Sequence, residues 1–176
     1  TEFYGNPSSL HGFGQVAKDG IERARQTIAN ALNAREDEIV FTGSGTESDN
    51  TVIKGTVHAL AAKGNHIITS GVEHHAIHEP LHFLEKQGLK VTYLPVDANG
   101  LVDPEEAKKA ITDETILVSV MHANNEIGTI EPIAAIGAVA HERGVLFHTD
   151  AVQTFGHIAI DVDAMNIDLL SASAHK

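Results

Sequence analysis

Five short polar stretches carry residue types that could do chemistry together, and each follows an apolar run of the sequence. A glycine-rich turn before a helix can bind an anion, because the free N–H groups at the helix start point at it. A lysine beside a histidine is a candidate nucleophile. The stretches are residues 42–48 with Gly45 and Thr46, 73–78 with His74, 121–126 with Asn125, 148–153 with Asp150 and Gln153, and 173–176 with Ser173, His175 and Lys176.

Each stretch also has an ordinary structural interpretation. Ser44 or Thr46 could cap a helix, and so could Asp150, because short oxygen-bearing side chains accept hydrogen bonds from a first helical turn. Adjacent asparagines are common in turns, and most lysines lie at the surface. Taken one at a time, the stretches are weak indications of a site, and their places in the fold have to decide.

Apolar, β-branched runs alternate with segments of helical periodicity along the chain. The alternation predicts an α/β fold, a mainly parallel open sheet with helices on both faces in three layers. Gly64, Gly88 and Gly144 follow helical segments, where left-handed C-terminal caps are expected. The expected strands are residues 38–42, 66–69, 90–95, 115–121, 145–149 and 168–173, and the expected helices are residues 16–32, 46–63, 76–87, 104–111 and 132–143.

The polar stretches follow expected strands, and open parallel sheets bind their ligands at the carboxyl ends of the strands. Together they offer an anion cradle, a flat ring, an amide, a carboxylate and a lysine. Pyridoxal phosphate needs this set: a phosphate site, a stacking partner, a group for the ring hydroxyl, an acid at the pyridine nitrogen and a lysine for the imine. A nicotinamide or nucleotide site would not need the lysine, and the glycine fingerprints of such sites are absent.

The composition excludes several classes of protein. Among 176 residues, 24 acidic and 12 basic side chains give a formal net charge of −12, so nucleic acid is not an expected partner. Without cysteine, the chain forms no disulfide or thiolate metal site. No apolar run is long enough to span a membrane and no signal peptide is visible, so a cytoplasmic protein is expected. Because the chain starts at Thr1 and stops at Lys176, we interpret it as an internal fragment.

Longer motifs add a resemblance to a known family. The chain resembles the cysteine desulfurases of the NifS/IscS-like group, fold-type I pyridoxal phosphate enzymes of the class-V aminotransferase subgroup. The resemblance implies conversion of L-cysteine to L-alanine, with sulfur passed as a persulfide towards iron–sulfur cluster assembly. It runs from residues 5–11 to the last two residues, and its most specific motifs are residues 41–50 (Phe-Thr-Gly-Ser-Gly-Thr-Glu-Ser-Asp-Asn), 121–128 (Met-His-Ala-Asn-Asn-Glu-Ile-Gly) and 150–153 (Asp-Ala-Val-Gln).

The resemblance implies roles for the residues around the cofactor ring. His74 would stack on the pyridine ring and shuttle protons, while Asn125 and Gln153 would bond the ring hydroxyl or the substrate side. Asp150 would pair with the protonated ring nitrogen. Lys176 would hold the cofactor as a Schiff base and then act as the base at the substrate α-carbon. Lys176 and His74 are therefore the expected catalytic residues.

The cofactor phosphate would be bound by Gly45 and Thr46, with help from Ser173 and His175. By the same resemblance, residues 1–176 form the large cofactor-binding domain, with an N-terminal arm, a last sheet strand and a C-terminal small domain outside them. That last strand is antiparallel and lies between the first and sixth strands in the family. The sulfur-accepting cysteine and the arginine for the substrate carboxylate also lie downstream, so these residues alone are expected to be inactive. The expected partners are L-cysteine, a second copy in a homodimer, and an iron–sulfur scaffold or other sulfur acceptor.

Two alternatives remain open at this point. The first stays within the cofactor class, as a selenocysteine lyase or another enzyme of the same subgroup. The second is a non-catalytic histidine-rich metal-binding module built on His74, His78 and His82, which share one helix face at spacings of four residues. Chance clustering is easy among 12 histidines, so we expect no metal site.

Overall fold

The computed structural model describes residues 4–176, which form two compact units. The first unit comprises the chain up to Phe41 together with Ala159–Asp161. Its helix α1, Gly12–Leu32, begins four residues before the expected start and ends at Asn33 in the left-handed conformation. A short 3-10 helix, η1, follows at Glu36–Glu38. The assignment of all 176 residues to one cofactor-binding domain stays a prediction.

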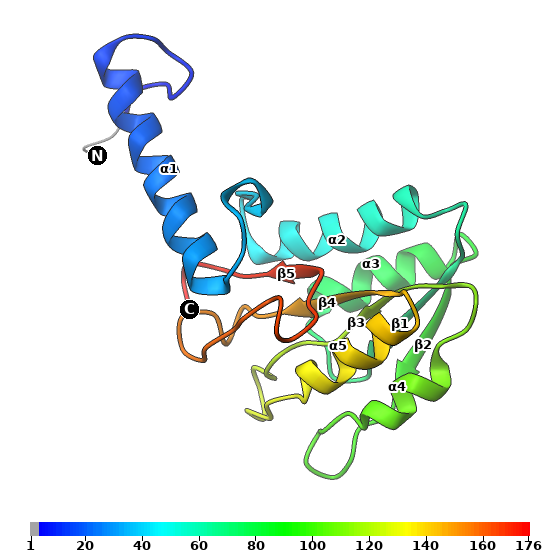
Figure 1. Cartoon of the computed structure of the whole chain (residues 1–176). Coiled ribbons are helices and arrows are strands. Elements are labelled where there is room, and N and C mark those ends of the chain that lie inside the picture. Colours follow the sequence, from blue (N-terminus) through cyan, green and yellow to red (C-terminus); the bar gives the residue numbers. More distant parts are fainter. Residues whose placement is uncertain (1–3) are drawn as a thin grey trace. The chain divides into compact units, whose positions relative to one another are not determined.

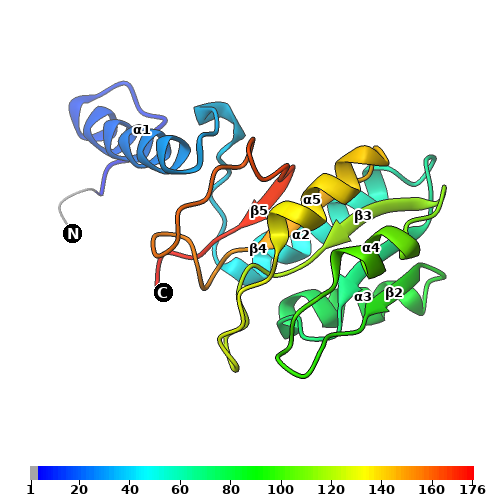
Figure 2. The same ribbon diagram turned by 60° about the horizontal axis from the view of Figure 1, so that its bottom comes forward.

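The second unit, Thr42–Ile158 with Val162–Lys176, contains a five-stranded parallel sheet in the order β2-β1-β3-β4-β5 (Figure 1). Helices α2 and α3 cover one face of the sheet, and α4 and α5 cover the other (Figures 1 and 2). This confirms the predicted three-layer α/β arrangement. The strands are β1 (His66–Ser70), β2 (Lys90–Leu94), β3 (Thr115–Ser119), β4 (Leu146–Asp150) and β5 (Leu169–Ser171), and the helices are α2 (Gly45–Ala59), α3 (His75–Glu85), α4 (Pro104–Ala110) and α5 (Ile133–Glu142).

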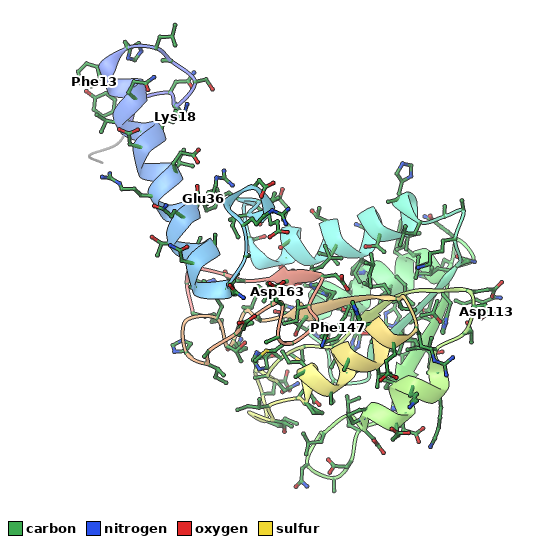
Figure 3. All side chains as sticks on the ribbon, in the orientation of Figure 1. Phe13, Lys18, Glu36, Asp113, Phe147 and Asp163 are labelled. Carbon is green, nitrogen blue, oxygen red and sulfur yellow. The ribbon has the colours of Figure 1, made fainter. Side chains whose placement is uncertain are left out.

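The core of this unit explains why the strands read as continuous apolar runs. Every residue of β1 and β3 is buried, as expected for parallel strands covered on both faces. Ile53 of α2 and Ile77 of α3 pack on Ile67 and Leu117 of the sheet. On the opposite face, the fully buried Phe147 of β4 lies beside α5 (Figure 3). None of the helices in residues 4–176 is both long and apolar enough to cross a membrane.

The expectation of a first strand at residues 38–42 is wrong. Glu36–Glu38 form η1, and residues 39–42 are irregular. A strand requires a neighbouring strand for its hydrogen bonds, and within residues 4–176 none pairs with this segment. Val40 and Phe41 are accordingly 77% and 49% exposed.

The three glycines expected as left-handed helix caps divide into two kinds. Gly88 and Gly144 have φ angles of +103° and +64°, as predicted. Gly64 does not have a positive φ, and its expected role was wrong. A Cβ atom built there would lie 2.1 Å from the carbonyl oxygen of Glu114, so this position needs glycine for close backbone approach just before β1.

The variant Gly64→Ala is therefore expected to lower the free energy of unfolding by about 1–3 kcal/mol, because the backbone at Glu114 has to move. Gly55→Ala is the matched control, since a Cβ at this exposed α2 position meets nothing within 4 Å. Alanine in a helix should raise stability there by about 0.5–1 kcal/mol. Denaturant unfolding of the two variants measures both values, and equal effects would contradict the close-approach explanation.

Candidate cofactor site

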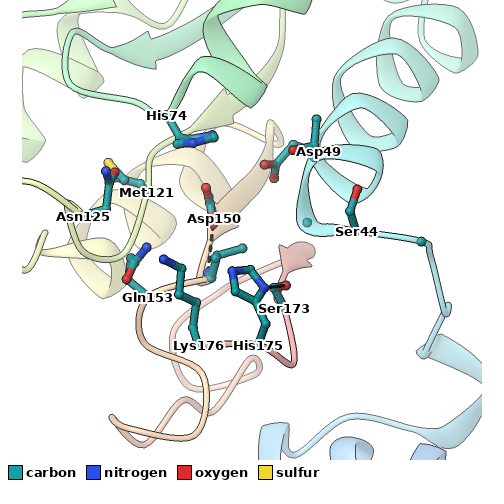
Figure 4. A pocket seen from close by; sticks show the side chains of 14 residues that line it. Ser44, Asp49, His74, Met121, Asn125, Asp150, Gln153, Ser173, His175 and Lys176 are labelled. Carbon is teal, nitrogen blue, oxygen red and sulfur yellow. Dashed lines mark hydrogen bonds between the residues drawn. The ribbon is translucent and has the colours of Figure 1, made fainter.

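A cavity of about 360 Å³ opens at the carboxyl ends of β4 and β5, next to the start of α2 (Figure 4). The structure brings all the site residues expected from the sequence to this one cavity, although they come from five separate stretches. Its lining includes Gly45, Thr46, His74, Asn125, Asp150, Gln153, Ser173, His175 and Lys176. Parallel topology explains why the residues that follow β1, β3, β4 and β5 gather here, because the carboxyl ends of parallel strands meet at one edge of the sheet. Gly45 and Thr46 instead begin α2.

The start of α2 forms an anion cradle. Ser44 is the N-cap, and its Oγ accepts the N–H of Glu47 at 3.1 Å. The carboxylate of Glu47 in turn accepts the N–H of Gly43 at 2.6 Å. The N–H groups of Gly45 and Thr46 belong to the first helical turn and have no acceptor within the helix. The capping and anion-binding interpretations of this stretch are therefore compatible.

His74, which follows β1, and Asp150, at the end of β4, both face the cavity (Figure 4). His74 is the N-cap of α3, and its Nδ1 accepts the N–H of Ala76 at 3.1 Å, which leaves Nε2 to carry the proton of the neutral ring. Asp150 Oδ1 accepts the N–H of Val152 at 2.9 Å. Burial raises the pKa of Asp150, and the Val152 N–H and nearby His74 lower it in part. A cation arriving in the cavity would favour the ionised form of Asp150 further.

The two adjacent asparagines have different tasks. Asn124 shapes the loop: its Oδ1 accepts the N–H groups of Glu126 at 2.8 Å and Ile127 at 3.0 Å, and its Nδ2 donates to the carbonyl of Val72 at 2.8 Å. Asn125 lines the cavity. The turn interpretation of the pair therefore holds for the first asparagine, and the binding interpretation is left to the second.

The last four residues reach the cavity from the end of β5. Ser173 Oγ and His175 Nδ1 are 2.7 Å apart, so these two side chains hydrogen-bond each other at the rim. The amine of Lys176 points into the cavity between Gln153 and Asp150 (Figure 4). A primary amine, a carboxamide and a buried carboxyl group thus face the same space, as a site for an aldehyde-bearing aromatic cation requires.

Sequence reasoning missed a buried polar layer next to the cavity. Its members are Asp49 of α2, Glu73 after β1, and His148 of β4, which are 1%, 7% and 0% exposed. Asp49 also lines the cavity, and its place on the same helix face as the buried Ile53 is the signal that could have found it. Burial raises the pKa of Asp49 to about 7 and lowers that of His148 to about 3.

Glu73 joins the carboxyl ends of two strands. Its Oε1 accepts the hydroxyl of Ser70 at 2.6 Å and the N–H of Met121 at 2.9 Å, while Oε2 is buried without a partner among residues 4–176. Burial raises the pKa of Glu73 from 4.5 to about 8, so this side chain is mainly protonated at neutral pH. Its neutral form fits a site in which a second charged carboxylate would be costly.

Glu73→Gln is expected to weaken the pH dependence of stability. The raised pKa of Glu73 means that the unfolded chain releases this proton first, so the wild-type unfolding free energy falls as pH rises from about 4.5 to about 8. The loss amounts to a few kcal/mol at about 1.4 kcal/mol per pKa unit. Glutamine keeps the acceptor for Ser70 and Met121 but cannot ionise. Denaturant titrations at pH 5 and pH 8 compare the two proteins, and equal slopes against pH would contradict a buried neutral Glu73.

The histidines on α3 do not form a metal cluster. His78 Nε2 lies 3.1 Å from the carbonyl oxygen of Ser70, and the rings of His78 and His82 stack at 6.0 Å beside Tyr93. His74 is occupied as a helix cap. Across residues 4–176, no group of three or more His, Cys, Asp or Glu side chains is placed to hold a metal ion.

Comparisons with known proteins identify the family of the chain. A model of the aminotransferase class-V family matches residues 1–176. The chain belongs to the class-V aminotransferase family. The class-V aminotransferase part of the resemblance noted in the sequence is thereby confirmed.

Three similar proteins are informative. This class-V aminotransferase chain is 60% identical over 175 residues to the cysteine desulfurase IscS of Dictyoglomus turgidum, covering 99% of the chain and 44% of that protein. It is 60% identical over 176 residues to the cysteine desulfurase IscS of Clostridium botulinum, covering 100% of the chain and 44% of that protein. A solved structure described as SspA in complex with cysteine matches with a TM-score of 0.95 and 43% identity, covering 99% of the chain and 50% of that structure. The chain thus spans less than half the length of these curated relatives.

Proposed function

We propose that the protein is a pyridoxal phosphate-dependent cysteine desulfurase. The observation that carries the proposal is the meeting of Lys176, Asp150, His74 and the α2 cradle on one cavity. It is supported by 60% identity to proteins named cysteine desulfurase and by a similar structure described as containing cysteine. Selenocysteine lyase activity is the alternative within the same cofactor class.

The cavity fits pyridoxal phosphate in its donor set and in its packing. A Cβ atom at Gly45 would lie 2.9 Å from Cγ2 of Val152, so the cradle is held close to the segment that follows β4. Gly45 and Thr46 would hold the phosphate at the helix start, with Ser173 and His175 beside it. Asp150 would pair with the ring nitrogen, and Lys176 would hold the cofactor covalently.

When bound, the cofactor supplies an aldehyde for covalent attachment and a ring that withdraws electrons from the substrate α-carbon. The protein residues do the rest. The amine of Lys176 would take the proton from the α-carbon of cysteine and return one during formation of alanine. His74, whose Nδ1 is occupied by the N–H of Ala76, would stack on the aromatic ring and move a proton at the substrate sulfur through Nε2. Asp150 would remain ionised opposite the ring nitrogen.

The sulfur transfer needs a thiol from outside these residues. In balanced form, L-cysteine and a protein thiol give L-alanine and a persulfide: the carbon–sulfur bond of the substrate breaks, and a sulfur–sulfur bond forms. The 176 residues contain no cysteine, so the accepting thiol belongs to another part of the protein or to a partner. The proposal therefore includes a sulfur-acceptor protein, such as an iron–sulfur scaffold. It also includes a second copy of the chain in a homodimer, which the sequence resemblance implies.

A protein of the relatives' full length tests the proposal. With pyridoxal phosphate, L-cysteine and a reducing thiol, it is expected to produce equal amounts of alanine and sulfide. Borohydride reduction is expected to attach the cofactor to Lys176, as mass spectrometry of the peptide would show. L-selenocysteine serves as the comparison substrate, and a higher kcat/KM for it would favour the lyase instead. Cofactor attachment to a different lysine, or no turnover of either substrate, would overturn the proposal.

A further inference from the structure

Asp49 supplies a second carboxyl group to the cavity, and none of the residue roles described above involves it. Its side chain projects from α2, one helical turn after Gly45, and is 1% exposed. Figure 4 shows Asp49 and Asp150 pointing into the same space in front of His74. Oδ1 of Asp49 has no hydrogen-bond partner among residues 4–176. A charged oxygen in this position would be both desolvated and close to another carboxylate.

The groups that face Asp49 do not supply a compensating buried cation. Nε2 of His148 lies 3.8 Å from Asp49 Oδ1, but the ring is fully buried between Ser119 and Ser171. Its Nδ1 is 2.9 Å from the Ser119 hydroxyl, and its Nε2 is 3.1 Å from the Ser171 hydroxyl. Because burial lowers the pKa of His148 to about 3, that ring is neutral at physiological pH. The titratable groups around Asp49 are His148 and Asp150 from β4, Glu73 and His74 from the segment after β1, and His175 and Lys176 at the cavity rim.

Two carboxyl groups in one poorly solvated space do not both ionise easily. Burial raises the pKa of Asp49 to about 7, and the charge of Asp150 contributes to this rise. Asp49 is already shielded from water, at 1% exposed, and an anion bound at Gly45 places a like charge one helical turn away from it. Burial and the like charge both disfavour the charged form of Asp49. The positive charge on the ring nitrogen of the ligand would pair with Asp150 and not with Asp49.

We propose that Asp49 is a positioning residue of the cofactor site that must carry a proton for a phosphate-bearing pyridine ligand to bind. The proposal rests on the proposed function, because it takes the cavity as the site of that ligand class. Its protonated carboxyl leaves Asp150 as the single carboxylate for the ring nitrogen. Binding above neutral pH therefore takes up one proton at Asp49, and the affinity declines as the pH rises.

The test uses pyridoxamine 5′-phosphate, which has no aldehyde and so binds without a covalent bond to Lys176. Dissociation constants are measured by titration calorimetry between pH 6 and pH 9 for the wild-type apoprotein at full length and for Asp49→Asn. Asparagine has the shape of the protonated acid but cannot ionise. The ratio of the wild-type to the variant dissociation constant is expected to be constant near pH 6. It should rise about tenfold per pH unit above about pH 7.5, because one proton is linked to binding.

A matched variant separates this effect from the change in net charge. Asp113→Asn alters the charge equally at an exposed loop position (Figure 3), and its ratio to wild type is expected to stay constant with pH. Calorimetry in two buffers of different ionisation enthalpy gives the number of protons taken up. At pH 8.5 the wild type should take up about one proton more than Asp49→Asn. Proton exchange by other groups cancels in this difference.

The outcomes distinguish the two proposals. Binding with a ratio that stays within twofold from pH 6 to pH 9, or with equal proton uptake, overturns the role of Asp49 and leaves the cofactor assignment in place. No binding of pyridoxamine 5′-phosphate to the wild type at any pH overturns the proposed function itself. If Asp49→Asn does not fold, Asp49→Ser replaces it, because serine is smaller and also cannot ionise in this range.

Discussion

Asp150→Asn in the full-length protein is expected to lower kcat/KM for L-cysteine by on the order of 10³-fold. The residue is buried at the end of β4, with Oδ1 bound to the N–H of Val152 and the carboxyl group lining the cavity. Asparagine keeps the shape and the hydrogen bond from Val152 but removes the negative charge. Removing one partner of a buried ion pair costs about 3–5 kcal/mol, which corresponds to about 10²–10⁴ in rate or affinity. Steady-state alanine formation measures the loss.

Its control is Asp163→Asn, which removes one negative charge from an exposed position (Figure 3) and should leave kcat/KM within twofold. Asp150→Glu restores the charge on a longer side chain and is expected to recover part of the activity. The absorption spectrum of the bound cofactor provides a second measurement, because the protonation of the ring nitrogen changes its bands. Wild-type kcat/KM in Asp150→Asn would show that the ring nitrogen has no counter-ion here.

Lys176→Ala is expected to abolish covalent attachment of the cofactor and to lower kcat by at least about 10³-fold. The variant loses both the amine that holds the cofactor and the base at the substrate α-carbon, and a general base alone contributes about 10²–10⁴. The start of α2 and Asp150 remain, so the cofactor should still bind but be removed by dialysis. Mass spectrometry after borohydride reduction checks the attachment, and alanine formation checks the rate.

Lys18→Ala is the matched control, because Lys18 is an exposed lysine of α1 that does not line the cavity. It should bind and retain the cofactor as the wild type does. Added methylamine is a sharper probe of Lys176→Ala, since a small amine can take the place of a missing lysine side chain. Partial recovery of activity would support the role of the amine as a base. A reduced cofactor adduct on another lysine of Lys176→Ala would contradict the assignment.

The sequence predicted the parts of the site that follow from topology alone. His74, Asn125 and Asp150 each come at or shortly after the end of an expected strand, and parallel pairing brings such positions to one edge. Their gathering needed no knowledge of side-chain packing. Lys176 was reached by the same argument, because it follows β5 as the others follow their own segments. Gly45 follows residues 38–42, which form no strand, so its place at the cavity does not follow from strand pairing.

The remaining features depend on contacts between distant residues, which no local pattern encodes. Asp49 is buried only because α2 lies over Ser171 and His148, and Glu73 is buried only because it bridges the ends of β1 and β3. Gly64 follows a helical segment, as a helix cap would, but glycine is needed there because the backbone of Glu114 lies against it. Residues 38–42 have strand-forming composition, but strand formation also requires a neighbour.

The strand order β2-β1-β3-β4-β5 also has a consequence for the timing of cofactor loading. The cradle at Gly45 and the amine of Lys176 are at opposite ends of the second unit's sequence, yet they border one cavity. Such a site belongs to the contacts of high sequence separation, which form late because the chain between them must first be ordered. During synthesis on the ribosome, the apolar strands β1 and β3 can pack before Lys176 has emerged. Covalent attachment of the proposed cofactor to Lys176 would therefore follow the folding of this part of the sheet.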